Sequence, residues 1–386
     1  MQWQRDTALT QRQTPQLARQ QAMLEAMPGC LSHLILSGRL RGQQRLALCV
    51  LAACSVLLQT TLSAQPHHHH AADQAVHSED VPVAVTAVAK PAVCREHKLT
   101  LQVLGSGGPI ADDARASSGY LLWHDGKARL LVDIGSGSLL RFAQAGASVD
   151  DLQAILITHT HVDHIGDLSG LIKSSYFSRR REPLELFGPD GNDRFPGISA
   201  WMHSQFTGDQ AAYRYLDGIA DGSRGMFRID THEIERTSSA QILIDSDGLK
   251  VSAVMVKHGI VPALGYVINI DGIKIAIPGD MNADNQAFVK LAADSDLVIM
   301  SLAIAQQAGG VAARLHAPPA DIGRMAAAMG AKQLMLSHIM QRAVRHPDAT
   351  IAAVREHYAG PLALASDLTC VYLSPANPPN DGTAEQ

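Results

Sequence analysis

The segment ITHTHVDHIGD, residues 157–167, constrains the fold more than any other part of the chain. It follows the apolar run AILI at 154–157, which is typical of a buried strand. Its four polar candidates are His159, His161, Asp163 and His164. In an extended chain residues 159 and 161 point the same way, whereas the next pair turns toward a second point. Imidazole and carboxylate groups suit zinc and similar ions, and four ligands this close favour two metal ions over one.

Two metal ions need further ligands, and three more candidates each follow an apolar strand. His258 ends VSAVMVKH, Asp280 ends IKIAIPGD, and His338 ends KQLMLSH. Any one of them alone would more often be an ordinary polar loop residue. Together and in this order they indicate a metal centre built where several strands end.

The surrounding pattern alternates hairpins with helices. Segments 120–135, 241–259 and 266–280 each read as two strands joined by an Asp-Gly turn. Helical spacing is expected after residue 138, at 167–177, at 196–218, at 285–295 and at 319–330. Hairpins with helices at both ends favour an α/β, four-layer αββα sandwich over a doubly wound parallel sheet. One hydrolase domain is expected over residues 98–375.

With HTHVDH, the strand-end His258, the PGD aspartate and the SH of LMLSH, the chain resembles the metallo-β-lactamase superfamily. The resemblance implies that His159, His161 and His258 hold one zinc ion, that Asp163, His164 and His338 hold the other, and that Asp280 bridges them. It further implies a bridging hydroxide as nucleophile, oriented in part by Asp163. Asp133 of LLVDIG is expected to orient a ligand histidine. Two Zn²⁺ are the expected cofactors, although Mn²⁺ or Fe suits the same ligands.

Within the superfamily, the C-terminal half resembles the ribonuclease Z and arylsulfatase-like branch. The segment KHGIVPALGYVI and the closing segment from LHAPPADIG to LMLSHI carry this resemblance. It implies that His316 lies at the active site and stabilises or protonates the leaving oxygen. The alternative is an N-cap or surface histidine ahead of a proline-rich helix start.

Three departures argue against tRNA processing. The family's long tRNA-binding arm is replaced by a short hairpin between His258 and Asp280. The glutamate of the family's HEA stretch is missing, because the chain reads Ser301-Leu302-Ala303. An exported protein would not meet tRNA precursors, and an acidic chain would repel RNA, for which the net charge of −5 gives no basic footprint. A small-molecule anionic ester is therefore the expected substrate, and no nucleic acid is expected as a partner.

The leading hypothesis is hydrolysis of a phosphodiester or related anionic ester. A lactonase or β-lactamase-type activity is the alternative, and a periplasmic zinc-binding protein is the non-enzyme alternative. The run RRR at 179–181 would either attract an anionic substrate or form a solvated turn.

The N-terminal 64 residues read as an extension and a signal peptide. Three arginines precede the apolar run LALCVLAACSVLL at 46–58, and small residues lie before a cleavage site after Ala64. Thirteen residues are too few to span a bilayer comfortably, so the mature form is expected to lack a membrane span. A periplasmic or secreted protein follows, with a lipoprotein acylated at Cys54 as the alternative.

Residues 65–97, which include HHHH at 67–70, are expected to form a disordered linker, and residues 376–386 a disordered tail. The histidines either gather zinc or are a compositional accident. Export would leave Cys94 and Cys370, which are either bridged or unpaired. The oligomeric state is open, and a homodimer would be in keeping with the branch.

Overall fold

The computed structural model describes residues 94–374. The predicted leader, most of the linker and the tail lie outside the described residues. The linker was expected to reach residue 97, but the structure already has a 3-10 helix, η1, at Cys94–Glu96, with Cys94 buried. In the described part of the chain, no helix is both long and apolar enough to cross a bilayer.

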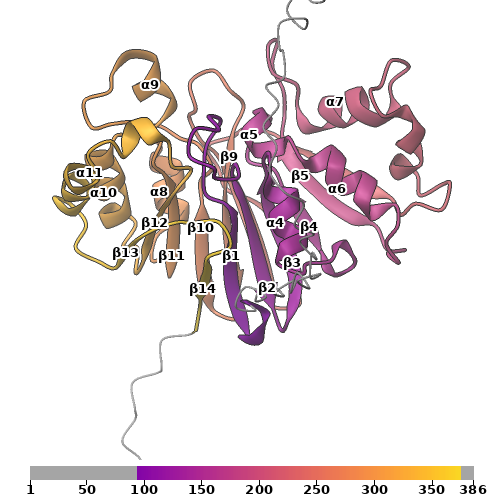
Figure 1. Cartoon of the computed structure of the whole chain (residues 1–386), viewed down its shortest axis with the longest axis horizontal. Coiled ribbons are helices and arrows are strands. Elements are labelled where there is room, and N and C mark those ends of the chain that lie inside the picture. The colour runs from indigo at the N-terminus through magenta and orange to yellow at the C-terminus, as the bar shows by residue number, and fades with distance from the viewer. Residues whose placement is uncertain (1–93, 375–386) are drawn as a thin grey trace, which may run out of the picture. The chain divides into compact units, whose positions relative to one another are not determined.

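The described chain forms two seven-stranded sheets (Figure 1). The first has the order β14-β1-β2-β3-β4-β5-β6, built from Cys370–Tyr372, Leu99–Gly105, Gly119–His124, Lys127–Ile134, Ala154–Leu156, Leu184–Pro189 and Ile229–Ile234. The second has the order β13-β12-β11-β10-β9-β8-β7, built from Leu362–Leu364, Leu334–Ser337, Leu297–Ser301, Ile273–Ile277, Leu264–Ile270, Leu249–Met255 and Gln241–Ser246.

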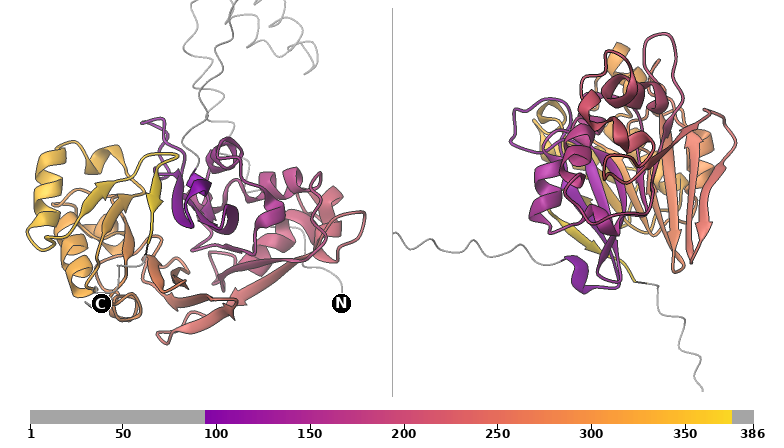
Figure 2. Two further views of the ribbon diagram at one scale, coloured as in Figure 1. Left: turned by 90° about the horizontal axis from the view of Figure 1, so that it is seen from below. Right: turned by 90° about the vertical axis from the view of Figure 1, so that its right-hand side faces the viewer.

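Helices cover the outer face of each sheet (Figures 1 and 2). Against the first sheet lie α4 (Ser138–Gln144), α6 (Leu168–Ser175) and α7 (Ile198–Met202), and against the second lie α8 (Gln286–Leu291), α10 (Pro319–Ala328) and α11 (Pro347–Arg355). Two short helices, α5 (Val162–Ile165) and α9 (Gly310–Leu315), lie beside the candidate site. The predicted αββα sandwich is confirmed.

Strand periodicity explains why the layers form. Neighbouring side chains of a strand point to opposite faces of its sheet. Leu121 therefore packs under the helices of the first sheet, whereas Leu122 packs between the two sheets. In the second sheet, Ile275 lies between the sheets and Ala276 under the outer helices. Because both faces of both sheets are covered, the central strands are apolar almost throughout, whereas the edge strands β6 and β7 carry polar, partly exposed side chains.

The three predicted hairpins are β2–β3, β7–β8 and β9–β10. Their turns are Asp125-Gly126, Asp247-Gly248 and Asp271-Gly272, and all six residues have φ between 50° and 79°. This is the backbone of a type I′ turn, which requires positive φ at both central positions and which aspartate and glycine tolerate best.

The structure corrects one expectation, the helix over 196–218, and settles an open one, the pairing of Cys94 with Cys370. The continuous helix expected over 196–218 is wrong: α7 runs into a π-helical turn, η3 (His203–Thr207), which ends at the extended Gly208 before the 3-10 helix η4 (Arg214–Ala220). At the other end of the sheet, Cys94 and Cys370 form a disulfide bond with Cα atoms 5.6 Å apart. It fastens η1 to β14, the strand that pairs with β1.

Candidate metal centre

The candidate ligands lie where strands of both sheets end. Residues 159–164 follow β4, Asp280 follows β10, His338 follows β12 and His258 follows β8. The turn Pro278-Gly279 brings Asp280 toward the first sheet. Gly279 has φ of 62°, and a Cβ there would lie 2.6 Å from the Cβ of Thr158, so only glycine allows this approach.

Three imidazoles form what we call the histidine group: His159, His161 and His258. The Nε2 atom of His159 lies 3.1 Å from Nδ1 of His161, which is 3.4 Å from Nε2 of His258. The other ring nitrogens of two members are occupied: Nδ1 of His258 donates to the Leu315 carbonyl, and Nδ1 of His159 lies 3.1 Å from Oγ1 of Thr158. The remaining nitrogens therefore converge, as one metal ion requires.

Asp163, His164 and His338 form the carboxylate group. Oδ2 of Asp163 lies 3.1 Å from Nε2 of His338 and 3.6 Å from Nε2 of His164. All three side chains are buried. His338 has φ of 48°, a left-handed conformation that is rare for a residue with a Cβ and that recurs at functional sites.

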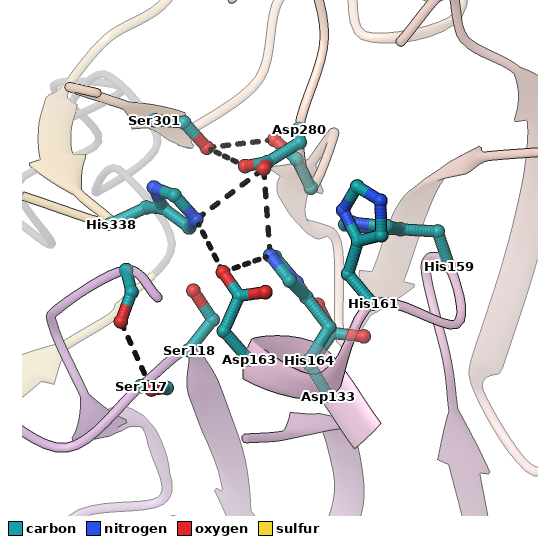
Figure 3. A network of polar contacts seen from close by, with 12 residues as sticks. Ser117, Ser118, Asp133, His159, His161, Asp163, His164, Asp280, Ser301 and His338 are labelled. Carbon is teal, nitrogen blue, oxygen red and sulfur yellow. Dashed lines mark hydrogen bonds and ion pairs between the residues drawn. The ribbon is translucent and has the colours of Figure 1, made fainter. Parts of the chain in front are cut away.

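Asp280 lies between the two groups (Figure 3). Its Oδ2 atom is 3.3 Å from Nε2 of His338, 3.6 Å from Nε2 of His164 and 3.8 Å from Nε2 of His258. Its other oxygen, Oδ1, accepts a hydrogen bond of 2.8 Å from Ser301. The carboxylate is thus held by its back oxygen and presents its front oxygen to both groups, as a bridging ligand would.

Asp133 supports the carboxylate group from beneath. It is fully buried, and its Oδ2 accepts from Nδ1 of His164 at 2.8 Å and from Oγ1 of Thr158 at 2.8 Å. Its Oδ1 accepts from the Thr158 amide at 2.7 Å. The hydrogen bond from Nδ1 of His164 to Asp133 leaves Nε2 of His164 directed toward the metal position. This is the orienting role expected of Asp133.

His316 also lies in the site. It caps the C-terminus of α9, its side chain is buried, and its Nδ1 is 3.7 Å from Oδ2 of Asp280. His316 is neither on the surface nor the N-cap of α10, since its side chain is buried and the N-cap is Pro318. With His258 and Asp280 it forms a further set of donors that is close enough to hold an ion.

The electrostatics of the two groups differ. Burial lowers the pKa of His159, His161 and His258, and the charges of neighbouring histidines lower it further, although Asp280 acts in the opposite direction. Burial alone would raise the pKa of Asp163, but the hydrogen bond from His338 and the charge of His164 bring it to about 2. Burial works against a charged His164 as well, yet Asp280 and Asp133 raise its pKa well above the usual value. Burial lowers the pKa of His316 to about 4.

Several supporting residues were not anticipated from the sequence. Thr158 bonds to Asp133, and its carbonyl accepts from Leu264, so it links the two sheets beneath the ligands. Ser301 was noted only for the missing glutamate beside it, but it fastens Asp280. The available signal was a hydroxyl residue directly before a ligand, as Thr158 is, or at the end of a strand, as Ser301 is.

The arginine run lies outside the candidate site. Arg180 is buried and donates to the carbonyls of Val149, Leu152, Glu182 and Pro183. Its guanidinium therefore holds these loop segments together. The run lines a surface hollow with Asp150, Asp151 and Glu182, which is separate from the candidate site.

The ligand residues fit a pair of divalent ions. Nε2 of His164 is buried without a hydrogen-bond partner although it faces two carboxylates, which is the arrangement expected of a metal-binding nitrogen. The donor set of imidazole nitrogens and carboxylate oxygens is that of zinc, manganese or iron. The site opens into a cleft of about 420 Å³.

Comparisons with known proteins agree with this geometry. The family described as "Beta-lactamase superfamily domain" matches residues 128–339. Ribonuclease Z of Salinispora arenicola is 26% identical over 310 residues, covering 73% of this chain and 98% of the relative. Ribonuclease Z of Mycobacterium bovis is 30% identical over 205 residues, covering 52% of this chain and 69% of the relative.

Among solved structures, the short form of human tRNase Z is similar with a TM-score of 0.55 and 23% identity, covering 71% of this chain and 99% of that one. This likeness bears on the fold alone. With the family match, the ribonuclease Z relatives and the ligand geometry together, the chain belongs to the metallo-β-lactamase superfamily, on its ribonuclease Z branch, and is a metal-dependent hydrolase.

Proposed function

We propose that this protein is an exported hydrolase with two metal ions that cleaves a phosphodiester or a related anionic ester of low molecular weight. The observation that carries the proposal is the position of Asp280, with one carboxylate oxygen within 3.8 Å of ligand nitrogens from both groups. A single-ion or storage site has no need of a carboxylate shared in this way.

The histidine group would hold one ion, the carboxylate group the other, and Asp280 would contact both. Two divalent ions bound there would lower the pKa of bound water and stabilise negative charge on the substrate. Zinc is the first choice, because imidazole and carboxylate are its usual ligands in proteins, and manganese or iron is the alternative.

Two protein groups would act on the substrate directly. Asp163 lines the cleft, and its ionised carboxylate would accept a hydrogen bond from the attacking water and orient it. His316 faces the same cleft. Because burial keeps its imidazole neutral, it would donate its remaining N–H to the departing oxygen rather than protonate it.

The curated relatives carry the name of a ribonuclease, so RNA is the competing substrate. Two features favour a smaller molecule. The hairpin β9–β10 fills the chain between His258 and Asp280, which leaves no extended arm there to hold an RNA. The protein is also acidic overall, whereas RNA binding draws on clustered Lys and Arg.

Export is supported by the leader-like N-terminus and by the bond between Cys94 and Cys370. Disulfide bonds persist in oxidising compartments and are rare in the bacterial cytosol. Detection of the protein in a periplasmic or culture fraction, in its oxidised form, would test this part of the proposal.

The enzymatic test is hydrolysis of bis(p-nitrophenyl) phosphate by the purified protein, with metal content measured in parallel. We expect p-nitrophenolate release that requires added zinc and is lost in Asp280→Ala. A protein that holds two metal ions yet releases nothing would overturn the phosphodiester proposal, and p-nitrophenyl sulfate and simple lactones would be tested next.

A further inference from the structure

The walls of the catalytic cleft are apolar. Five side chains line it above the ligands: Pro109, Ile110, Val162, Leu315 and Met340. They come from four separate segments, namely the β1–β2 loop, α5, the end of α9 and the loop after β12. Convergence of four segments on one apolar surface makes this wall a feature of the site rather than of one loop.

The outer part of this wall is exposed. The side chain of Ile110 is 49% exposed and that of Val162 is 67% exposed. Ile260, two residues after a ligand histidine, and Val311 of α9 are exposed to a similar degree on the neighbouring segments. Exposed aliphatic side chains that line a site, as Ile110 and Val162 do, indicate a surface that is covered when a ligand binds.

One cation faces the cleft. Arg342 lines it, and its guanidinium donates from Nε to the Ala303 carbonyl and from Nη2 toward the sulfur of Met340. Its Nη1 has no hydrogen-bond partner among residues 94–374, so it is available to an anionic oxygen.

The described lining lacks the groups that would read a base or a sugar. Apart from the site residues and Arg342, it contains no lysine, hydroxyl, amide or aromatic ring. Recognition of a nucleobase normally uses stacking on aromatic side chains and hydrogen bonds to the base edges. Beyond the site residues, this cleft offers one cationic side chain, Arg342, and a hydrocarbon surface instead.

We infer that the substrate is an amphiphilic phosphodiester, with its phosphate between the metal centre and Arg342 and an aliphatic chain lying along Ile110, Leu315 and Met340. The inference rests on the proposed function and narrows its substrate class. Water adds to phosphorus, and the bond from phosphorus to the leaving oxygen breaks with its electron pair remaining on that oxygen. The products are an alkyl phosphate and the alcohol or phenolate, and the proton lost by water passes to the leaving oxygen or to solvent.

The test compares methyl, butyl and octyl p-nitrophenyl phosphate, with the full chain loaded with zinc and each probe below its critical micelle concentration. We expect kcat/KM to rise by about two- to fourfold for each methylene that the wall covers. A flat or falling series would overturn the inference and leave the phosphodiesterase proposal standing. Faster cleavage of thymidine 5′-p-nitrophenyl phosphate than of the octyl ester would overturn it in favour of nucleotides.

Matched variants locate the chain. Ile110→Asn should lower the ratio of octyl to methyl kcat/KM about tenfold or more, because a polar group replaces the exposed wall. Ile242→Asn makes the same chemical change on the edge strand β7, outside the lining of the cleft, at a side chain that is 58% exposed, and should leave the ratio unchanged. Equal effects of both variants would overturn the assignment of the wall.

A binding measurement is independent of turnover. Calorimetry should give a lower Kd for octylphosphonate than for methylphosphonate, by about tenfold or more. If no diester is cleaved, the proposed function fails. In that case equal binding of the two phosphonates would overturn the amphiphile inference as well, whereas tighter binding of octylphosphonate would support an amphiphilic anion of another ester class.

Discussion

The histidine group and the carboxylate group lie side by side, but the protein prepares them in opposite ways. The three imidazoles of the histidine group have lowered pKa values and are neutral at pH 7. In the carboxylate group the pKa of His164 is raised, Asp163 is ionised, and Asp133 holds the imidazole from below.

This difference has a consequence for loading. The histidine group can accept a cation without first losing a proton, whereas binding at the carboxylate group must displace the proton that His164 retains beside two carboxylates. The histidine group therefore relies on burial for its readiness, and the carboxylate group relies on supporting hydrogen bonds. Substitutions of Asp280, which both groups share, of His316 in the cleft, and of the supporting Asp133 should therefore affect the two groups differently.

The largest effect is expected from Asp280→Ala, which removes the carboxylate that both groups share. We expect turnover to fall by about 10⁴-fold or more, with loss of at least one equivalent of metal by elemental analysis. Ser301→Ala is the matched control, because it keeps the carboxylate and removes a hydroxyl that contacts Oδ1 of Asp280 at 2.8 Å and the Gly279 carbonyl at 2.9 Å. Wild-type rates in the aspartate variant would contradict a shared ligand.

His316→Ala should lower kcat by about 10²- to 10³-fold while both equivalents of metal remain bound, because one hydrogen-bond donor to the leaving oxygen is lost. The imidazole lies 3.7 Å from Asp280 but opens onto the cleft, so it should serve the substrate rather than either group. Loss of metal from this variant would instead make His316 a ligand and break the division into two groups.

Asp133→Asn should act on the carboxylate group alone. The amide can present an N–H to His164, which forces the imidazole proton onto Nε2 and blocks the nitrogen meant for the metal. We expect metal affinity there to fall by about 10- to 100-fold, measured by competition with a chelator, while the histidine group keeps its ion. Equal weakening of metal binding at both groups would show that Asp133 does not act on the carboxylate group alone.

The smallest effect is expected in the metal-free protein, where the two groups should differ in how they make the free energy of unfolding depend on pH. The buried histidines have lower pKa values folded than unfolded, so the unfolded chain binds more protons and stability falls as the pH drops below about 6.5. His164 acts oppositely, since its contribution is present below about 6.5 and is lost as the pH rises through its raised pKa.

Each buried histidine with a lowered pKa should contribute a loss of up to about 1.4 kcal/mol per pH unit below about pH 6.5, measured by urea unfolding of chelator-treated protein between pH 5 and 7. Asp163 would add a further loss as the pH falls from about 4 toward 2. Stability that increases between pH 7 and 5 would mean that the carboxylate group dominates.

The sequence was most informative where chemistry and position coincide. His258, Asp280 and His338 could be found because each polar residue ends an apolar strand, and strand ends meet at one edge of a sheet. The Asp-Gly hairpins were equally accessible, because positive φ at two successive positions selects so few residues. Asp133 could be assigned through the resemblance of its segment.

What could not be found depends on contacts distant in sequence. Arg342 and Met340 look like ordinary residues until the loop after β12 brings them beside Ile110. The interruption at the extended Gly208 was also missed, because helical spacing of side chains does not reveal where the backbone leaves the helix. Ser301 shows the same limit, since a hydroxyl at a strand end has meaning only once Asp280 lies next to it.

The bond between Cys94 and Cys370 also orders events in time. Its two cysteines are 276 residues apart, so the first is synthesised long before its partner exists. Cleavage after Ala64 would leave no third cysteine in the chain, and therefore no incorrect pairing within one molecule. Oxidation would then mark the moment when the last strand, β14, has been made and has reached β1.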